Sequence, residues 1–344
     1  MSRYDRVYMI EKPLFVPTPP FCLEIYTPGI LDELTLQPTI RQPPASHEVE
    51  IEVCAVGLNF KEVMKALGIY PDNSEGHVTF GGDFAGKIVA IGEDVKEFKI
   101  GDEVMGIGAK SFSSFATVPT HCLVAKPANL SFEEAVTIPG TFLTAYYALQ
   151  HLGRLNKGER VLIHAAAGGV GLAAVQLSQM VGAEIFATAG NSQKREFLRS
   201  LGIKYVMDSR SVAFADEVME LTGGKGVDVI LNSLAGEFIP KSLSVLAKFG
   251  RFLEIGKRDI YENSQLGLYP FRNNLSFFAI NLGQVWLERP DFTVSLFREV
   301  MQCFEDGVFQ PLPYKVFPIS EVVSAFRYMR KTKHIGKIVV SLTK

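Results

Sequence analysis

A hydrophobic run that breaks into small residues and then enters an apolar-periodic segment constrains this chain more than any other feature. Residues 161–164 read Val-Leu-Ile-His, residues 165–171 are small apart from one valine, and residues 172–181 repeat apolar side chains at helical spacing. The pattern predicts a strand, a tight turn and a helix. Ala166, Gly168 and Gly171 have the spacing of a dinucleotide-binding turn, in which the backbone approaches a pyrophosphate at the helix N-terminus. A glycine turn that only packs helix on strand gives the same pattern.

The segment after this helix favours NADPH over NADH. Residues 183–188 form a second apolar run of strand length. An acid that ends this strand would accept hydrogen bonds from the ribose 2′-hydroxyl of NAD, but the chain continues as Ala-Gly-Asn-Ser-Gln and then Lys194 and Arg195. These two cations are our candidates for a 2′-phosphate, with Arg210 as a weaker one. A solvated helix start would carry the same residues.

The alternation of strands and helices continues and defines a nucleotide-binding domain. Short apolar runs, as buried parallel strands give, alternate with helical segments at 204–207, 214–221, 227–231, 238–247 and 251–255. Residues 131–275 are therefore interpreted as a doubly wound Rossmann domain. Ser131 and Glu134 have the spacing of a helix capping box at its entry.

The two ends of the chain have a different texture. Residues 1–130 contain short apolar runs separated by glycine and proline, which is typical of an antiparallel β domain. In the last part, 276–344, residues 320–329 predict a helix and residues 336–342 a closing strand that returns to the first domain.

Composition and charge limit the classes of function. The chain has 344 residues, 47% of them hydrophobic, and a formal net charge of -2, so we expect no nucleic-acid partner. No run has the length of a membrane span, so we expect no membrane partner and a cytoplasmic location. The four cysteines are scattered without metal-ligand spacing, and we expect no metal site. His164, inside a predicted strand, is interpreted as structural.

Six motifs in order carry a family resemblance over nearly the whole chain. They are VGLNFKEVM at 56–64, GDFAG at 82–86, IPGTFLTAYYAL at 138–149, the glycine turn, NSLAGE at 232–237 and FLEIGKRD at 252–259. With them the sequence resembles the enoyl reductase domains of modular polyketide synthases, zinc-free members of the medium-chain dehydrogenase/reductase superfamily. The resemblance implies a GroES-like domain, built from both ends of the chain, around the Rossmann domain.

The resemblance also implies a reaction and its partners. Hydride from NADPH adds to the β-carbon of an α,β-unsaturated thioester that phosphopantetheine tethers to an acyl carrier protein, and the enolate is protonated at the α-carbon. Neighbouring polyketide synthase domains are implied as partners. We expect an excised domain, although a discrete trans-acting reductase would have a similar sequence.

Four residues are candidates for the chemistry. Lys257, at the end of a predicted strand where open sheets place ligands, is the first choice as proton source; a solvated loop lysine is the alternative. Asn281 stands where relatives commonly have an aspartate, and an amide is no comparable acid. Tyr70 matches a tyrosine linked to α-carbon stereochemistry, or else packs in a turn. Asn59 is expected to reach the nicotinamide ribose or the substrate carbonyl, or to cap the helix of residues 60–67.

The remaining candidates are cofactor residues from the glycine turn, from strand ends and from the family motifs. They are Ala166, Gly168, Gly169, Val170, Gly171, Thr144, Thr188, Ser192, Lys194, Arg195, Arg210, Asn232, Ser233, Ile255 and Gly256.

Three other functions stay open at this point. A substrate with a leaving group at the γ-carbon would let the same enolate close a cyclopropane, which Asn281 slightly favours. A free-standing NADPH:quinone or alkenal reductase would use diffusing substrates. A protein that has lost catalysis would bind NADPH without consuming hydride.

Overall fold

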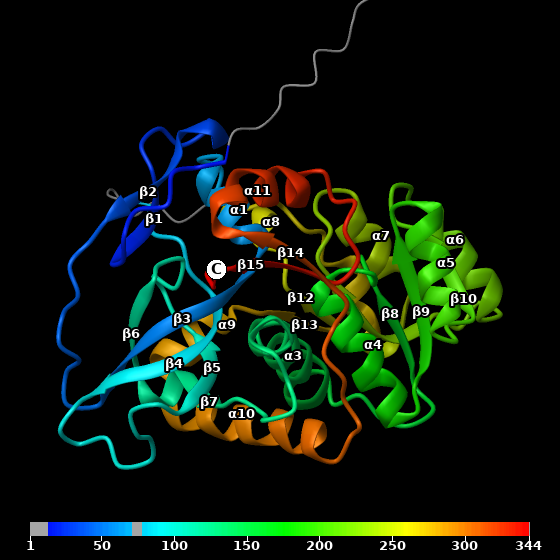
Figure 1. The fold of residues 1–344 in the computed structure, drawn as a ribbon. Coiled ribbons are helices and arrows are strands. Elements are labelled where there is room, and N and C mark those ends of the chain that lie inside the picture. Colours follow the sequence, from blue (N-terminus) through cyan, green and yellow to red (C-terminus); the bar gives the residue numbers. More distant parts are fainter. Residues whose placement is uncertain (1–12, 71–77, 344) are drawn as a thin grey trace, which may run out of the picture.

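Two large sheets, one parallel and one mainly antiparallel, organise the chain, and helices cover and connect them (Figure 1). The structure is a computed structural model and describes residues 13–70 and 78–343. The predicted α/β fold with a second, mostly-β domain is confirmed. Among the described residues, no helix is both long and apolar enough to cross a membrane.

The parallel sheet has six strands in the order β10-β9-β8-β11-β12-β13. Their bounds are β8 (Arg160–Ile163), β9 (Glu184–Ala189), β10 (Tyr205–Asp208), β11 (Val227–Asn232), β12 (Leu246–Glu254) and β13 (Ser276–Ala279). The chain winds outward from β8 through β9 to β10, and then from β11 through β12 to β13. The direction reverses between β8 and β11, and open sheets bind ligands at such a switch point.

Helices connect these strands as the sequence predicts. They are α4 (Gly169–Val181), α5 (Ser192–Ser200), α6 (Phe214–Leu221) and α7 (Phe238–Ser244). In α4, the apolar side chains at helical spacing, among them Leu172, Val175 and Leu177, are buried against the sheet. The predicted capping box is present at α2 (Phe132–Ala135), where Ser131 Oγ accepts from the Glu134 amide and the Glu134 carboxylate accepts from the Ser131 amide.

The predicted domain boundary at residue 275 is wrong for this sheet. β13 begins at Ser276 and pairs in parallel with β12, so the parallel sheet has one strand more than residues 131–275 contain. Beyond it, α10 (Pro290–Glu305) packs on α3 (Pro139–Tyr146), and the chain rejoins the first domain only afterwards. The prediction omits β13 because this strand is only four residues long and partly exposed, and its place in the sheet comes from its pairing with β12.

The second sheet has seven strands, in the order β14-β15-β3-β4-β5-β7 with β6 paired to β3. Their bounds are β3 (Glu48–Leu58), β4 (Asp83–Ile91), β5 (Glu103–Ile107), β6 (Phe115–Pro119), β7 (Leu123–Ala125), β14 (Tyr314–Pro318) and β15 (Lys337–Ser341). β15 runs antiparallel to β3, with Val340 opposite Val56. The predicted return of the C-terminal strand to the first domain is therefore confirmed.

The other elements surround these sheets. The strands are β1 (Phe21–Ile25) and β2 (Leu34–Pro38), and the helices are α1 (Phe60–Ala66), α8 (Arg258–Tyr261), α9 (Leu282–Glu288) and α11 (Val322–Arg330). Short helical turns are η1 (Leu31–Glu33), η2 (Thr120–Cys122), η3 (Tyr147–Leu152), η4 (Tyr269–Asn273) and η5 (Ile319–Glu321).

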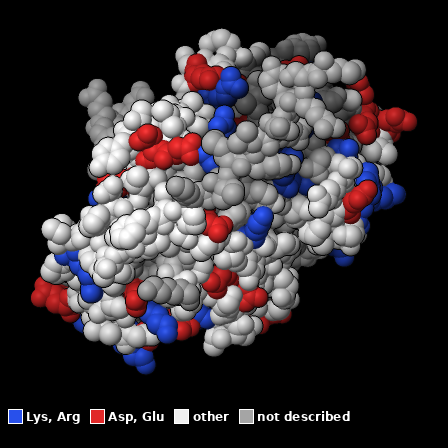
Figure 2. Space-filling view, turned by 45° about the horizontal axis from the view of Figure 1, so that its top comes forward, with Lys and Arg blue, Asp and Glu red and all other residues white. Residues whose placement is uncertain are grey.

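One hydrophobic cluster joins the two halves of the molecule. It contains Ala85 and Met105 from the antiparallel sheet, Phe142 from α3, and Val161 and Leu253 from the parallel sheet. Because both sheets share this core, their relative position is fixed by packing. On the face shown in Figure 2, basic and acidic side chains are interspersed.

Gly171 is needed where α4 crosses β8. A Cβ atom at this position would lie 2.6 Å from Ala166 Cα and 2.7 Å from the Ala165 carbonyl oxygen. We predict that Gly171→Ala destabilises the protein by roughly 1–3 kcal/mol, as overpacking does, in a thermal unfolding measurement. Gly168→Ala is the control, because its Cβ would meet only the Ala165 oxygen at 3.3 Å. Equal unfolding temperatures for the two variants would contradict the prediction.

Candidate functional site

Lys257, Tyr70 and Asn281 meet in one hydrogen-bonded group. Lys257 Nζ lies 3.0 Å from Tyr70 Oη and 3.0 Å from Asn281 Oδ1. Lys257 follows β12 and precedes α8, Asn281 follows β13 and precedes α9, and Tyr70 lies four residues beyond α1. Three residues that are far apart in the sequence, from both halves of the molecule, therefore share one place.

The strand register explains why Lys257 and Asn281 are neighbours. β12 and β13 run in parallel with Glu254 opposite Ala279, so the residues that follow each strand emerge at the same edge of the sheet. Lys257 is partly buried, and the alternative of a solvated loop lysine is wrong. Pro71, which would form the alternative turn with Tyr70, lies outside the described residues.

The group has a definite hydrogen-bonding direction. An ammonium has only donors, so Lys257 donates to the phenol oxygen of Tyr70 and to the amide oxygen of Asn281. Asn281 is an acceptor towards Lys257 and supplies no proton. The arrangement can place a cation and a phenol beside a developing oxyanion or carbanion.

A buried carboxyl group supports the loop that carries Lys257. Glu254 Oε2 accepts from Asn232 Nδ2 at 2.5 Å, and Glu254 Oε1 accepts from the Gly256 amide at 2.6 Å. Burial raises the pKa of Glu254 to about 8, against the two hydrogen bonds, which lower it. The same loop is tied again where Asp259 accepts from the Gly236 amide at 3.0 Å. The chain after β12 is thereby fixed to the chain after β11.

Sequence reasoning missed Glu254, although a signal was present. An acid inside the apolar run Phe-Leu-Glu-Ile requires a partner when the strand is buried. Asn232 was predicted to bind the cofactor; it is fully buried, and its side chain is used by Glu254 and Leu234. Ser233 is exposed beside it, and Ile255 and Gly256 are partly exposed.

The glycine turn leaves the N-terminus of α4 open. Gly168 is the N-cap of this 13-residue helix, and none of the described side chains caps it. Gly169 and Val170 form its first turn, with Ala166 fully buried beneath. Uncapped amide groups at a helix N-terminus attract anions, so the backbone fits the pyrophosphate of a dinucleotide.

Two predicted cofactor threonines have other partners. Thr188 is fully buried, and its hydroxyl lies 3.0 Å from His164 Nδ1 and 3.4 Å from the Ala165 amide. His164 Nε2 lies 2.9 Å from Ser242 Oγ, and burial lowers its pKa to about 3, so it is a neutral, structural histidine as predicted. The Thr144 hydroxyl donates to the Gly140 carbonyl group within α3.

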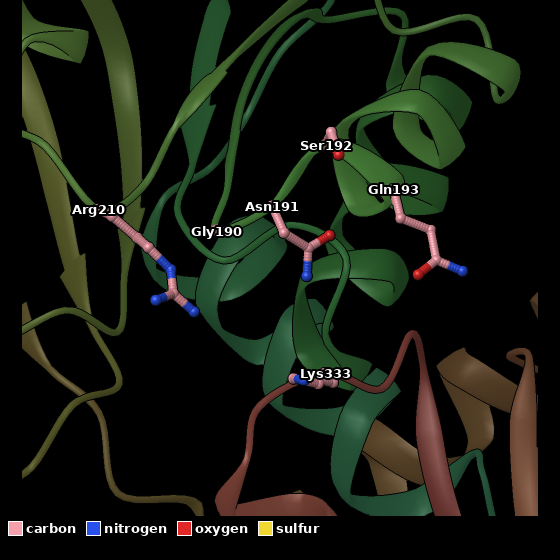
Figure 3. A pocket seen from close by; sticks show the side chains of 6 residues that line it. All are labelled: Gly190, Asn191, Ser192, Gln193, Arg210 and Lys333. Carbon is pink, nitrogen blue, oxygen red and sulfur yellow. The ribbon is translucent and has the colours of Figure 1, made fainter. Parts of the chain in front are cut away.

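A cavity follows β9 at the place predicted for a 2′-phosphate. Its volume is about 490 Å³, and it is lined by Gly190, Asn191, Ser192, Gln193, Arg210 and Lys333. In Figure 3, Arg210 and Lys333 approach it from different segments of the chain, the loop after β10 and the segment before β15. Sequence reasoning missed Lys333, because only the tertiary fold brings the C-terminal segment to this loop.

Lys194 and Arg195, the two cations that the sequence favours for the 2′-phosphate, form hydrogen bonds with other groups of the protein. Lys194 Nζ donates to the Thr332 carbonyl group at 2.8 Å, and its pKa is lowered by burial and then by Arg210. Arg195 donates to the Ala189 carbonyl group and pairs with Asp208 at 3.1 Å. Arg210, the weaker candidate in the sequence, lines the cavity.

Asn59 is the N-cap residue of α1, but its side chain caps nothing. Asn59 Nδ2 lies 3.1 Å from Asp83 Oδ2, and its Oδ1 lies 2.7 Å from Lys337 Nζ. The capping alternative is wrong, because the side-chain amide of Asn59 is hydrogen-bonded to the buried ion pair of Asp83 and Lys337. The described residues contain no group of three or more His, Cys, Asp or Glu side chains that could hold a metal ion.

Comparisons with known proteins define first the class and then the family. The family described as "Alcohol dehydrogenase GroES-like domain" matches residues 45–148, and "Zinc-binding dehydrogenase" matches residues 169–303. The structure titled "Crystal structure of CurK enoyl reductase" is 48% identical, with 94% of this chain and 99% of that chain covered and a TM-score of 0.87. The chain belongs to the enoyl reductases of polyketide synthases.

Other relatives share this fold at different distances. "CurF ER cyclopropanase from curacin A biosynthetic pathway" is 44% identical, with 94% and 99% of the two chains covered and a TM-score of 0.88. Quinone oxidoreductase of Escherichia coli, solved with NADPH, is 25% identical, with 93% and 99% covered and a TM-score of 0.83. A phenolphthiocerol/phthiocerol polyketide synthase of Mycobacterium tuberculosis is 43% identical over 93% of this chain. The match spans 15% of that synthase polypeptide's length.

Glu62 provides a stability test of the polar region near Asn59. Its carboxyl group is fully buried without a hydrogen-bond partner among the described residues, and burial raises its pKa from 4.5 to about 7. The folded protein holds a proton that the unfolded chain releases, so this group makes the free energy of unfolding fall between pH 4.5 and 7. We compare the free energy of unfolding of Glu62→Gln with that of the parent at each pH. We predict that this difference is more favourable to the variant at pH 8 than at pH 4.5, by on the order of 3 kcal/mol.

Urea unfolding at the two pH values measures this difference. Glu220→Gln, at an exposed position of α6, is the matched control for removal of a carboxyl group. The prediction fails if Glu62→Gln changes the free energy of unfolding equally at both pH values.

Proposed function

We propose that this protein is an NADPH-dependent enoyl reductase that acts on an α,β-unsaturated thioester bound through phosphopantetheine to an acyl carrier protein. The observation that carries the proposal is the Lys257 ammonium group, held between Tyr70 and Asn281 at the ligand-binding edge of the parallel sheet. The family membership supplies the reaction class, and the cytoplasm is the proposed location.

The backbone and the 2′-phosphate cavity support the cofactor part of the proposal. The open N-terminus of α4 suits a pyrophosphate, and Arg210 with Lys333 suits a 2′-phosphate. NADPH, when bound, supplies the hydride that adds to the β-carbon of the substrate. The described residues that line the cavity include no acid, so none of them favours the 2′-hydroxyl of NADH.

Lys257 and Tyr70 are the groups that handle the enolate. A positioned ammonium stabilises negative charge near the thioester oxygen and can donate a proton, and the adjacent phenol is a second donor. Asn281 orients Lys257 through a 3.0 Å hydrogen bond without competing as an acid. The proposed stabilisation and protonation of the enolate thus depend on Lys257, whose side chain is oriented by hydrogen bonds to Tyr70 and Asn281.

We predict that Lys257→Met lowers kcat for reduction of a pantetheine enoyl thioester by roughly 10²–10⁴-fold, the usual contribution of a positioned acid. NADPH oxidation gives the rate, and mass spectrometry identifies the saturated thioester. Lys248→Met, which removes an exposed lysine on β12, is the matched control. An unchanged kcat in Lys257→Met would remove the lysine from the mechanism.

Cyclopropane formation is a second candidate. One observation favours it: Asn281 stands in place of the acid that relatives commonly have. The 44% identity to the CurF cyclopropanase does not separate the two reactions, because the JamJ enoyl reductase has the same identity and the CurK enoyl reductase has 48%. A γ-chloro enoyl thioester distinguishes the two fates of the enolate. A saturated chlorinated thioester supports reduction, and a cyclopropane with released chloride supports the variant. If the protein oxidises NADPH with a quinone but with neither thioester, both proposed reactions are wrong. If it oxidises NADPH with none of these substrates, the protein is non-catalytic.

Arg210 and Lys333 test the choice of cofactor. We predict that the double variant Arg210→Ala, Lys333→Ala weakens NADPH binding by roughly tenfold or more for each lost charge-assisted hydrogen bond. NADH binding should stay unchanged, because NADH lacks the 2′-phosphate. Fluorescence titration measures both affinities, and Lys331→Ala, at an exposed position nearby, is the control. Equal losses for NADPH and NADH would contradict this assignment.

The partners follow from the size of the relatives. The matched polyketide synthases are much longer than this chain, which supports neighbouring synthase domains as partners. The acyl carrier protein is proposed as the substrate carrier because the relatives are domains of polyketide synthases.

A further inference from the structure

Asn59, Asp83 and Lys337 form a buried polar cluster that the proposed chemistry does not use; we call it the Lys337 cluster. Lys337 Nζ lies 2.6 Å from Asp83 Oδ2 and 2.7 Å from Asn59 Oδ1. The side chains of Lys337 and Asp83 are only 3% and 1% exposed. A buried ion pair of this kind stabilises little compared with an apolar pair, so its position needs another reason.

The sheet register brings the three residues together. Asn59 follows the end of β3, Asp83 begins β4 opposite Gly57, and Lys337 begins β15 next to Ile338, which pairs with Leu58. Asp83 Oδ1 also accepts from the Gly140 amide at 2.7 Å, which ties the cluster to the start of α3. Asp83 thus accepts from three donors, the arrangement of an ionised carboxylate.

Lys337 extends from the glycine turn to Asn59. The preceding residue, Gly336, donates to the Ala167 carbonyl group at 2.9 Å and forms a bridge with Gly168. A Cβ atom at Gly169 would lie 3.3 Å from Lys337 Cδ. One side chain therefore links the predicted pyrophosphate site to Asn59.

The neighbours leave the Asn59 amide a single orientation. Lys337 can only donate and the Asp83 carboxylate can only accept, so Oδ1 must face Lys337 and Nδ2 must face Asp83. The Nδ2 group also lies 3.5 Å from the Gly57 carbonyl oxygen. Both amide hydrogens thus point to protein acceptors, while Oδ1 keeps a second lone pair, and Asn59 is partly exposed. Asn59 can offer the cleft an acceptor and no donor.

We propose that Lys337 and Asp83 are positioning residues that hold Asn59 so that its Oδ1 accepts a hydrogen bond from a hydroxyl group of the nicotinamide ribose. This inference rests on the proposed NADPH site. We assign Asn59 to the nicotinamide half of the cofactor because the chain runs from Asn59 through α1 to Tyr70, which is hydrogen-bonded to Lys257. The cavity proposed for the 2′-phosphate is lined by Arg210 and Lys333 instead. Asn59 Nδ2 faces Asp83 and Gly57, so Oδ1 is the atom that we assign to the ligand.

Two ligands separate this role from a general structural one. NADPH carries the nicotinamide ribose, and adenosine 2′,5′-bisphosphate carries only the other end of the cofactor. The test variant is the double substitution Asp83→Asn, Lys337→Met, which removes both charges together and leaves no unpaired buried ion. Lys337→Arg is the conservative variant, since a guanidinium group can donate to both partners.

Isothermal titration calorimetry on each folded variant gives the affinities, and thermal unfolding verifies the fold. We expect the double variant to bind NADPH about tenfold more weakly, the effect of one lost hydrogen bond. It should bind adenosine 2′,5′-bisphosphate as the parent does, and Lys337→Arg should retain most NADPH affinity. Asn59→Ala, which keeps the ion pair, should show the same selective loss and serves if the double variant does not fold.

Two results would overturn the inference while leaving the proposed function intact. One is an unchanged NADPH affinity in the double variant and in Asn59→Ala. The other is an equal loss for both ligands, which would show a general structural role. A parent protein that binds neither ligand would remove the proposed function itself, and the inference with it.

Discussion

The pairing of β15 with β3 is the interaction on which the contact between the C-terminal segment and both sheets depends. It brings a strand from the end of the chain into the first domain, and the residues just before it lie against the glycine turn. Gly336 must stay small there, because a Cβ atom would lie 1.9 Å from the Pro313 carbonyl oxygen. Lys337, the first residue of this strand, reaches Asp83, and Lys333, just before the strand, lines the cavity after β9. One short strand therefore connects both ends of the predicted cofactor site with the antiparallel sheet.

Three buried acids, Asp83, Glu254 and Glu62, differ in the partners of their carboxyl groups. Asp83 is matched by an ion pair and two further donors. Glu254 has two donors but no cation among the described residues, and burial raises its pKa to about 8. Glu62 has no hydrogen-bond partner in the described part of the chain, so its neutral form is favoured.

In the proposed reaction, the fate of the enolate depends on a proton and on the substrate, not on the fold. Reduction and ring closure would share the hydride step and Lys257. They diverge when the α-carbon takes a proton or displaces a γ-halide. Asn281 accepts a hydrogen bond from Lys257 and is no acid, so in the proposed mechanism proton delivery rests on the lysine and Tyr70.

The sequence by itself predicted the parallel sheet, the glycine turn and the return of the last strand, because local periodicity encodes them. The family resemblance selected Lys257, Tyr70 and Asn281, which the structure brings into one hydrogen-bonded group. It placed the boundary at 275 too early, since β13 gains its place from pairing rather than from pattern. Only the tertiary structure decided which cations line the 2′-phosphate cavity, that Asn59 joins an ion pair instead of capping α1, and that Glu254 supports the Lys257 loop. These contacts join residues on separate strands and loops. Buried polar groups need hydrogen-bond partners, but the spacing of residues along the chain does not show which groups will pair.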